Sequence, residues 1–272
     1  MDHAPRITVV TPSYNQAEFL ERTIRSVLDQ NYPNLEYIIV DGGSTDGSVD
    51  IIRKYESQLS WWVSEPDNGQ ADAINKGLSR ATGDWLAWQN SDDVYSPGAF
   101  ADLVASAKKY PLAGFIVGNI SLIDASDRLI RDLRYITPNY NALRAEGMLL
   151  ANQAAFWRRS MQVELGPIDD RLHYLFDYEW FLRLAVHTKG VHIGRTWGAL
   201  RRHDATKTST QAAAFQDEMK RVLSGREMPT WQIGIYKLRR YALLIAQGHL
   251  KYALRGFWRR TLARPNTVKR TS

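Results

Sequence analysis

Runs of apolar residues and stretches of helical spacing alternate along the first 110 residues of the chain. The apolar runs are short, and such runs rich in β-branched or aromatic residues are typical of strands buried on both faces. Between the runs, apolar residues recur every three to four positions, as they do on the inner face of a helix. The pattern predicts strands at residues 7–10, 37–40, 61–63 and 85–88, and helices at 17–28, 48–55, 71–79 and 97–109.

This alternation of strands and helices predicts an α/β fold with a Rossmann-like, mainly parallel sheet flanked by helices. Ligands bind such sheets beyond the carboxyl ends of the strands. Three polar loops follow expected strands there, at residues 11–15, 41–47 and 90–93. Later in the chain we expect strands at 115–117 and 121–123 and a helix at 177–185, whereas the pattern loosens from 136 to 175.

Asp41 opens a glycine-rich loop directly after an expected buried strand. Glycine allows the backbone to approach a ligand closely, and a carboxylate there can accept hydrogen bonds from a ribose or a base. The alternative is a simple turn in which residues 44–46 cap the next helix. Spacing alone leaves both interpretations open.

Three further positions carry groups that can do chemistry. Asp92 and Asp93 follow the aromatic strand, where carboxylates can bind a hard divalent cation, or alternatively cap a helix. Asp177 begins a helix, where it can act as a general base or simply favour the helix dipole. His203 can bind a metal or a phosphate, with Arg202 and Lys207 as phosphate partners, or it is an ordinary surface histidine.

Several ordered motifs between about residue 7 and about residue 208 resemble the family 2 glycosyltransferases of the GT-A fold. Residues 7–15 look like the opening strand and nucleotide loop of that family, and residues 37–48 like its second strand and acidic loop. Residues 67–77 resemble the donor-side helix, and residues 90–93 occupy the position of the metal-binding DxD motif. The segment 177–183 matches the one that carries the catalytic base. A late donor- or phosphate-contacting segment is resembled by Arg202, His203, Lys207 and Thr208.

The resemblance implies that a nucleoside diphosphate sugar binds across the strand ends and that an acceptor hydroxyl attacks its anomeric carbon with inversion. Asp177 would be the catalytic base, and Asp92, Asp93 and His203 would hold Mg²⁺ or Mn²⁺. The acceptor, a glycan or a lipid-linked precursor in surface polysaccharide or glycolipid assembly, would meet Gln153 and Glu179. The expected nucleotide-binding residues are Thr11, Pro12, Tyr14, Asn15, Asp41, Gly43, Asp72, Ser91 and Asp92.

Two positions depart from the family pattern. Asn90 replaces the first acid of the DxD motif, and Phe176 replaces a glutamate that often precedes the base. These departures keep open a non-catalytic scaffold that binds sugar nucleotides or docks to membranes. A nucleotidyltransferase would carry a glycine-rich, cationic loop after its first strand, and residues 11–15 contain neither glycine nor a cation.

The charge of the chain is unevenly distributed. Of the 272 residues none is cysteine, which excludes disulfides, thiolate metal sites and a cysteine nucleophile. Residues 221–272 contain twelve lysines and arginines but one acid, whereas the rest of the chain carries more acidic than basic residues. We therefore expect a GT-A domain over residues 1–215, with its donor half up to about 110 and its acceptor half at 111–215, and a basic helical tail at 216–272.

Apolar and basic residues alternate at helical spacing from 231 to 262. Leu250, Leu254, Phe257 and Trp258 are expected on one side of a helix. Such a helix can lie in an anionic membrane interface, or it can pack on the domain with a solvated basic face. No nucleic-acid recognition motif accompanies the charge, so no nucleic-acid partner is expected. Because we recognise neither a signal peptide nor a spanning segment, we expect a cytoplasmic protein, or one peripheral at the inner face of the membrane.

Overall fold

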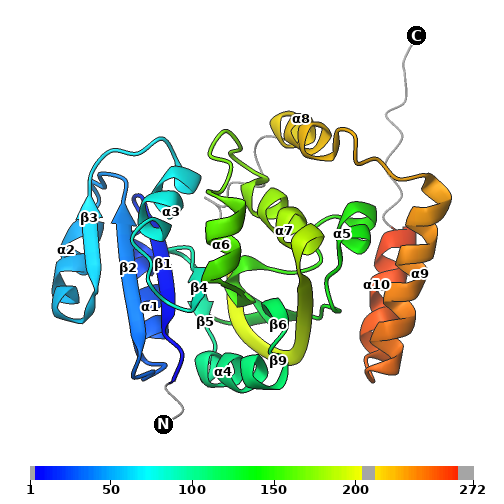
Figure 1. Cartoon of the computed structure of the whole chain (residues 1–272), viewed down its shortest axis with the longest axis horizontal. Coiled ribbons are helices and arrows are strands. Elements are labelled where there is room, and N and C mark those ends of the chain that lie inside the picture. The colour runs from blue at the N-terminus through cyan, green and yellow to red at the C-terminus, as the bar shows by residue number, and fades with distance from the viewer. Residues whose placement is uncertain (1–3, 204–211, 263–272) are drawn as a thin grey trace.

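A single nine-stranded sheet runs through the part of the chain that the computed structural model describes, residues 4–203 and 212–262 (Figure 1). Its strands are β1 (Ile7–Ser13), β2 (Leu35–Asp41), β3 (Trp61–Ser64), β4 (Trp85–Trp88), β5 (Val94–Tyr95), β6 (Ala113–Asp124), β7 (Leu129–Leu133), β8 (Ala155–Arg158) and β9 (Lys189–Arg202). The order across the sheet is β3-β2-β1-β4-β8-β6-β9-β5, and β7 pairs with β6.

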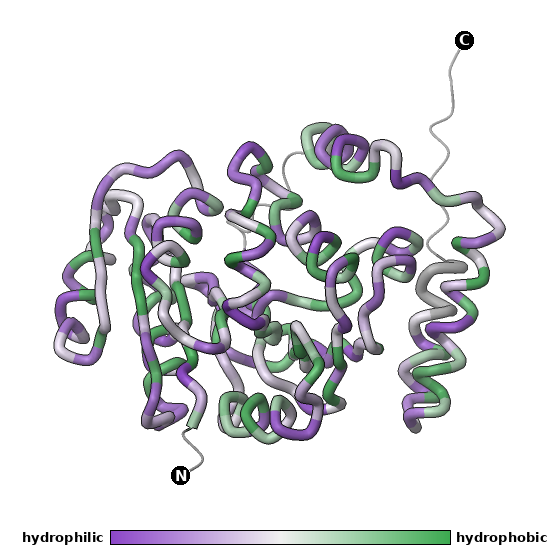
Figure 2. The backbone as a smooth tube through the Cα atoms, viewed as in Figure 1, coloured by the Kyte–Doolittle hydropathy of each residue, from purple (hydrophilic) through white to green (hydrophobic). Residues whose placement is uncertain are grey.

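Helices flank this sheet, and the hydropathy colouring of Figure 2 shows apolar and polar residues alternating along them. They are α1 (Ala17–Leu28), α2 (Ser48–Lys54), α3 (Gln70–Leu78), α4 (Ala99–Lys109), α5 (Tyr140–Glu146), α6 (Arg159–Leu165), α7 (Phe176–His187), α8 (Ala212–Leu223), α9 (Thr230–Ala246) and α10 (Leu250–Leu262).

The four strands of the amino-terminal half are parallel, as the sequence predicts. β1 pairs with β2 and β4, and β2 pairs with β3, all in parallel register. The burial of β1, β2 and β4 on both faces explains their nearly continuous apolar sequences, whereas the edge strand β3 is half-buried. The expected α/β architecture is therefore confirmed in this half.

The second half of the sheet is mixed, so the parallel expectation fails there. β8 runs antiparallel to both β4 and β6, while β6 and β9 are parallel. The two strands expected at 115–117 and 121–123 are one strand, β6. Gly118 lies within β6, at a point where a Cβ would come within 2.7 Å of the Trp197 ring on β9. The glycine marks a close approach inside the sheet and does not end the strand.

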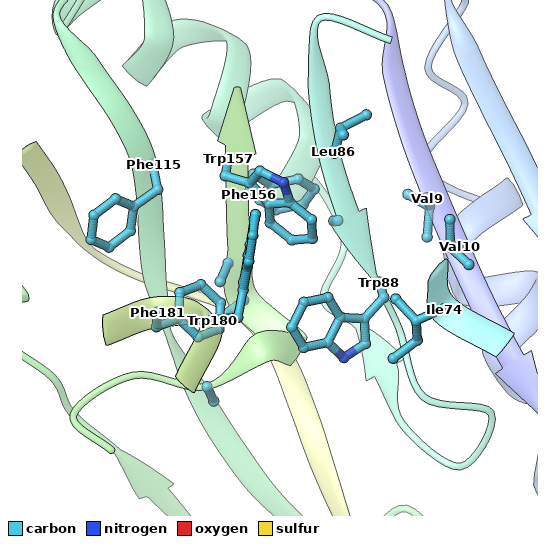
Figure 3. Close-up of a cluster of buried hydrophobic side chains, with 14 of the residues drawn as sticks. Val9, Val10, Ile74, Leu86, Trp88, Phe115, Phe156, Trp157, Trp180 and Phe181 are labelled. Carbon is cyan, nitrogen blue, oxygen red and sulfur yellow. The ribbon is translucent and has the colours of Figure 1, made fainter. Parts of the chain in front are cut away.

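An aromatic cluster joins β4, β8 and α7 in the core (Figure 3). The ring of Trp88 lies 5.3 Å from Trp157 and 6.0 Å from Phe181, and Trp157 lies 5.6 Å from Trp180. Close-packed rings of this size hold their elements at a defined separation. The cluster thus fixes α7 relative to the carboxyl end of β4.

Three helices, α8, α9 and α10, make up the carboxy-terminal part of the described chain. The expected domain boundary near residue 215 lies within α8, whose Glu218 and Val222 are buried. Beyond it, α9 and α10 form an adjacent pair at one end of the molecule, next to α5 (Figure 1). Among the described helices, none combines the length and apolarity needed to cross a bilayer.

Candidate active site

The loops after β1 and β2 meet at the carboxyl edge of the sheet. The backbone N–H of Asn15 donates to Ser44 Oγ at 2.8 Å, and the N–H of Thr45 donates back to Asn15 Oδ1 at 2.9 Å. Asn15 can accept this geometry because asparagine tolerates the left-handed backbone region, where its φ is 50°. Two of the loops predicted to contact a nucleotide are therefore joined to each other.

Asp41 holds the second of these loops together. Its side chain has no exposed surface and accepts hydrogen bonds from the backbone N–H groups of Gly43 and Ser44, at 3.1 and 2.9 Å. The hydroxyls of Ser44 and Ser64 donate to the same carboxylate, at 2.5 and 2.7 Å. The turn that the sequence left as an alternative is thus present, and Asp41 shapes it from within.

The other predicted nucleotide-binding residues divide into buried and accessible groups. Tyr14 is 61% exposed and Asn15 is exposed, whereas Thr11, Pro12 and Ser91 are buried. The remaining positions, Gly43, Asp72 and Asp92, are half-buried.

Two of these residues have clear structural partners. Thr11 is 3.0 Å from the hydroxyl of Tyr37 inside the sheet. Asp72 accepts the backbone N–H of Asn68 at 3.0 Å and stabilises the turn before α3. Both side chains therefore have partners within the protein.

Asp92 and His203 form the pair most suited to a cation. Asp92 Oδ2 lies 3.0 Å from His203 Nε2, although the two residues are 111 positions apart in sequence. The Asp92 side chain is 23% exposed, and the His203 ring packs 4.7 Å from the ring of Phe19. The loop after β4 and the end of β9 therefore present an oxygen and a nitrogen ligand side by side.

Asp93 points in the opposite direction, into the core. It has no exposed surface, and its carboxylate accepts the backbone N–H of Arg201 at 2.8 Å and the amides of Gln153 and Asn90 at 2.6 and 3.0 Å. Burial, followed by the negative charge of Asp92, raises the pKa of Asp93 well above its ordinary range. The predicted metal ligand Asp93 and the predicted acceptor contact Gln153 are thus partners of each other.

Asn90 has a structural reason to replace the first acid of the DxD motif. Its amide nitrogen donates to Asp93, and its amide oxygen accepts from Gln70 Nε2 of α3 at 2.8 Å. A carboxylate could not donate to Asp93 and would bring a second negative charge to a buried one. The asparagine therefore links α3 to the loop after β4 that carries Asp92 and Asp93.

Arg201 fixes the backbone of the same loop, and local patterning did not identify it. Its buried guanidinium donates to the carbonyls of Asp92 and Asp124, at 2.7 and 3.1 Å, and pairs with Asp127 at 2.6 Å. The neighbouring Arg202, singled out from the sequence, is exposed. The alternation of sides along β9 could have distinguished Arg201 from Arg202, because adjacent residues of a strand face opposite sides.

Asp177 lies in the first turn of α7, half-buried among apolar groups. Its Oδ1 accepts the backbone N–H of Tyr178 at 2.6 Å, and the preceding Phe176 packs 6.2 Å from Trp88. Burial raises the pKa of Asp177 to about 6. A carboxylate that titrates near neutrality is suited to accept a proton during a reaction.

A polar pocket lies between the start of α3 and the loop before α7. Neither predicted acceptor residue lines it, because Glu179 pairs with Arg183 at 2.9 Å and Gln153 faces Asp93. Its lining includes Asp170 and His173, which no local sequence pattern had marked. The lining residues are Asn68, Gly69, Gln70, Ala71, Asp170, Leu172, His173 and Phe176. Lys207 and Thr208, expected to contact phosphate, lie outside the described residues.

Sequence comparison assigns this site to a family. The sequence model described as Glycosyl transferase family 2 matches residues 8–164. The chain belongs to glycosyl transferase family 2. An uncharacterized glycosyltransferase of Mycobacterium tuberculosis is 34% identical over 202 residues, which cover 71% of this chain and 74% of that protein. The family predicted from the ordered motifs is thereby confirmed.

Solved structures share the fold of this family 2 chain. Staphylococcus aureus TarS aligns with a TM-score of 0.66 at 14% identity, over 84% of this chain and 41% of the TarS chain. The mannosyltransferase PcManGT from Pyrobaculum calidifontis, solved with GDP-Man and Mn²⁺, aligns with a TM-score of 0.61 at 19% identity, over 97% and 77% of the two chains. These similarities confirm the expected GT-A type of fold.

Proposed function

We propose that this family 2 glycosyltransferase is a metal-dependent, inverting enzyme that uses a nucleoside diphosphate sugar as donor. The observation that carries the proposal is the pairing of Asp92 with His203 at the carboxyl edge of β4, on the same face as the loops after β1 and β2. The donor complex with GDP-Man and Mn²⁺ solved for PcManGT supports a donor and a cation of these classes.

The residues present fit Mg²⁺ or Mn²⁺ shared with a diphosphate. Within the described residues no group of three or more His, Cys, Asp or Glu side chains gathers to hold a metal. Two protein ligands suffice when substrate phosphates and water complete the coordination, and Asp92 with His203 supplies two. Asp93 is left out of the proposed ligand set because its carboxylate faces three protein donors.

Each part of the site has a separate task in the proposed reaction. Tyr14, Asn15 and Gly43 would frame the nucleotide, while Asp41 keeps their loop in place. Asp92 and His203 would hold a cation, which would supply positive charge for the diphosphate leaving group. Asp177 would take the proton of the acceptor hydroxyl, because its carboxylate is half-buried and titrates near pH 6. Attack from the face opposite the diphosphate would invert the anomeric carbon.

Donor binding and hydrolysis across UDP-, GDP- and dTDP-sugars, each with Mn²⁺ and with EDTA, test this proposal. We expect one nucleotide class to bind only with metal and to release its nucleoside diphosphate slowly. Asp92→Asn should abolish the metal-dependent donor binding. Lys220→Gln, on an exposed face of α8, should leave that binding unchanged. Absence of binding to every donor, with and without metal, would favour the alternative of a non-catalytic, membrane-docked scaffold.

We further propose that the acceptor is a glycan or a lipid-linked precursor in polysaccharide or glycolipid synthesis, met at the cytoplasmic face of a membrane. The basic carboxy-terminal segment supports this setting, since it carries the charge that an anionic lipid surface attracts. The pocket that contains Asp170 and His173 is the proposed acceptor side of the site. Transfer to extracted lipid-linked acceptors, with the anomeric configuration read by NMR, tests this part.

A further inference from the structure

We propose that the exposed face of α9 is a docking surface that inserts into an anionic membrane. Five apolar residues repeat along this face at intervals of four, three, four and three positions, and all are exposed. The four large ones, Trp231, Ile235, Leu238 and Ile245, are 66, 54, 72 and 45% exposed, and Ala242 lies between them. That spacing places them in one stripe along the helix. We call this set the α9 stripe.

The α9 stripe is not the side on which the helix packs. The opposite side carries Arg240, which pairs with Glu146 of α5 at 3.1 Å, and Leu244, which is buried with Ile136 and Ala253. A surface helix ordinarily needs one apolar stripe to face its core. α9 has a buried face and a second, exposed apolar face. An exposed apolar face of this kind marks a surface that binds a partner.

The charges around the α9 stripe indicate what that partner is. Residues 228–272 contain no acid, and Lys237, Arg239, Lys251 and Arg255 are exposed on α9 and α10. An apolar stripe edged by cations is complementary to a bilayer with anionic headgroups. A second copy of the same surface would place cations against cations, and nucleic acid would leave the apolar residues exposed.

α10, which contacts α9, also exposes apolar residues. Leu250 and Leu254 are 49 and 48% exposed, and Lys251 and Arg255, which follow them in sequence, are exposed as well. The sequence expectation named Leu250 and Leu254 but missed the α9 stripe. The side chains of Phe257 and Trp258, named with them, lie outside the described residues.

This proposal deepens the proposed function, because a membrane-docked enzyme meets a lipid-linked acceptor directly. The test uses the full chain without donor or acceptor, so that it can fail independently of the transfer reaction. Sedimentation with phosphatidylcholine vesicles containing one-third phosphatidylglycerol should show binding that weakens with salt and with removal of the anionic lipid. Ile235→Ser with Leu238→Ser should reduce the partition coefficient about tenfold or more.

The matched control is Leu112→Ser with Val163→Ser, which removes two exposed apolar residues, 85 and 71% exposed, outside the tail. The control should bind vesicles like the parent, and circular dichroism should show that both variants are folded. Unchanged vesicle binding by the α9 variant would overturn the proposal. So would self-association of the parent that the α9 variant abolishes, or salt-sensitive binding to DNA in preference to vesicles.

A second, independent observation concerns the loop that leads into α7. We infer that Glu218 of α8 is a positioning residue for the base Asp177. The carboxylate of Glu218 is 4% exposed and accepts three consecutive backbone N–H groups, those of His173, Tyr174 and Leu175, at 2.7, 2.9 and 3.0 Å. These are the three residues directly before α7.

This contact affects two parts of the proposed site, because the loop carries His173 and leads into the helix that carries Asp177. His173 lines the proposed acceptor pocket, and a Cβ placed on Gly69 across the pocket would lie 3.9 Å from its ring. Asp177 follows two residues after Leu175. Charge-assisted hydrogen bonds from three backbone groups hold a loop more firmly than neutral ones. Glu218 therefore sets where the base and His173 stand relative to the donor.

The test separates positioning from general stability. Glu218→Ala should lower kcat about tenfold to a hundredfold while the affinity for the metal–donor complex stays within about twofold, because the donor loops lie on other elements. Glu218→Gln, which keeps one acceptor oxygen, should recover part of the loss. Asp217→Asn, its exposed neighbour on α8, is the matched control and should behave as the parent. An unchanged kcat, or donor affinity falling in step with kcat, would overturn the inference.

Discussion

Replacing Asp177 by asparagine should make the protein more stable and much less active. Burial raises the pKa of Asp177 from the ordinary aspartate value to about 6, a rise of roughly two pKa units. At about 1.4 kcal/mol per unit, the ionised carboxylate costs the folded state up to about 3 kcal/mol. Asparagine fills the same space, keeps an oxygen for the N–H of Tyr178 and carries no charge.

The sign of this effect depends on pH. Because the folded state binds the proton more tightly than the unfolded state, the protonated group contributes stability below about pH 4 that is lost as pH rises through about 6. The variant and the parent should therefore unfold alike near pH 4, and the variant should be more stable at pH 8. Urea unfolding at both pH values measures this difference in free energy.

Activity should change in the opposite direction. Loss of a general base lowers kcat by about 10² to 10⁴, while donor affinity with Mn²⁺ should stay unchanged because Asp177 is not a proposed ligand of the donor or the cation. In the parent, kcat/KM should rise with pH and level off above about pH 7. Turnover of Asp177→Asn at the parental rate, or equal stability of variant and parent at pH 8, would refute this reasoning.

Three further substitutions probe the supports of the site. His203→Ala should weaken Mn²⁺-dependent donor binding about tenfold to a hundredfold, measured by calorimetry, and leave metal-free binding unchanged. Asn90→Asp should lower the free energy of unfolding at pH 8 by about 1–3 kcal/mol, with less effect at pH 4, because it removes the donor to buried Asp93 and adds a charge. Gly77→Ala should cost about 1–3 kcal/mol in urea unfolding, because its Cβ would overlap the side chain of Val10.

The strands and helices of the amino-terminal half could be predicted because their signals are local. A buried parallel strand is apolar along its whole length, and β2 shows this in Tyr37, Ile38, Ile39 and Val40. The strand directions of the second half could not be predicted in this way. Whether β8 runs parallel or antiparallel to β4 depends on a pairing between segments far apart in the chain. Gly118 shows the limit well, because its close approach to Trp197 depends on β9, about 80 positions away, and leaves no local signal.

The chemistry of the acidic loops was visible in the sequence, but the task of each residue in them was not. Asp92 and Asp93 are adjacent and chemically identical, yet one is accessible and the other buried. What separates them is contact with His203 on one side and with Arg201 and Gln153 on the other. Such pairings span 60 to 111 positions and leave no local pattern.

By itself, then, the sequence determined the order of the first strands and helices and the loops that bear acids, because periodicity and chain order report burial and strand ends directly. The family followed from the resemblance of its ordered motifs. Only the tertiary structure decided that Asn90 and Arg201 support the loop that carries Asp92. It also decided that Glu218 accepts hydrogen bonds from the backbone before Asp177, and that an apolar face of α9 is exposed. These features follow from which surfaces meet when distant segments pack. The packing of distant segments also decides which atoms are buried, and burial sets both the pKa of a carboxylate and the partner that a surface can accept.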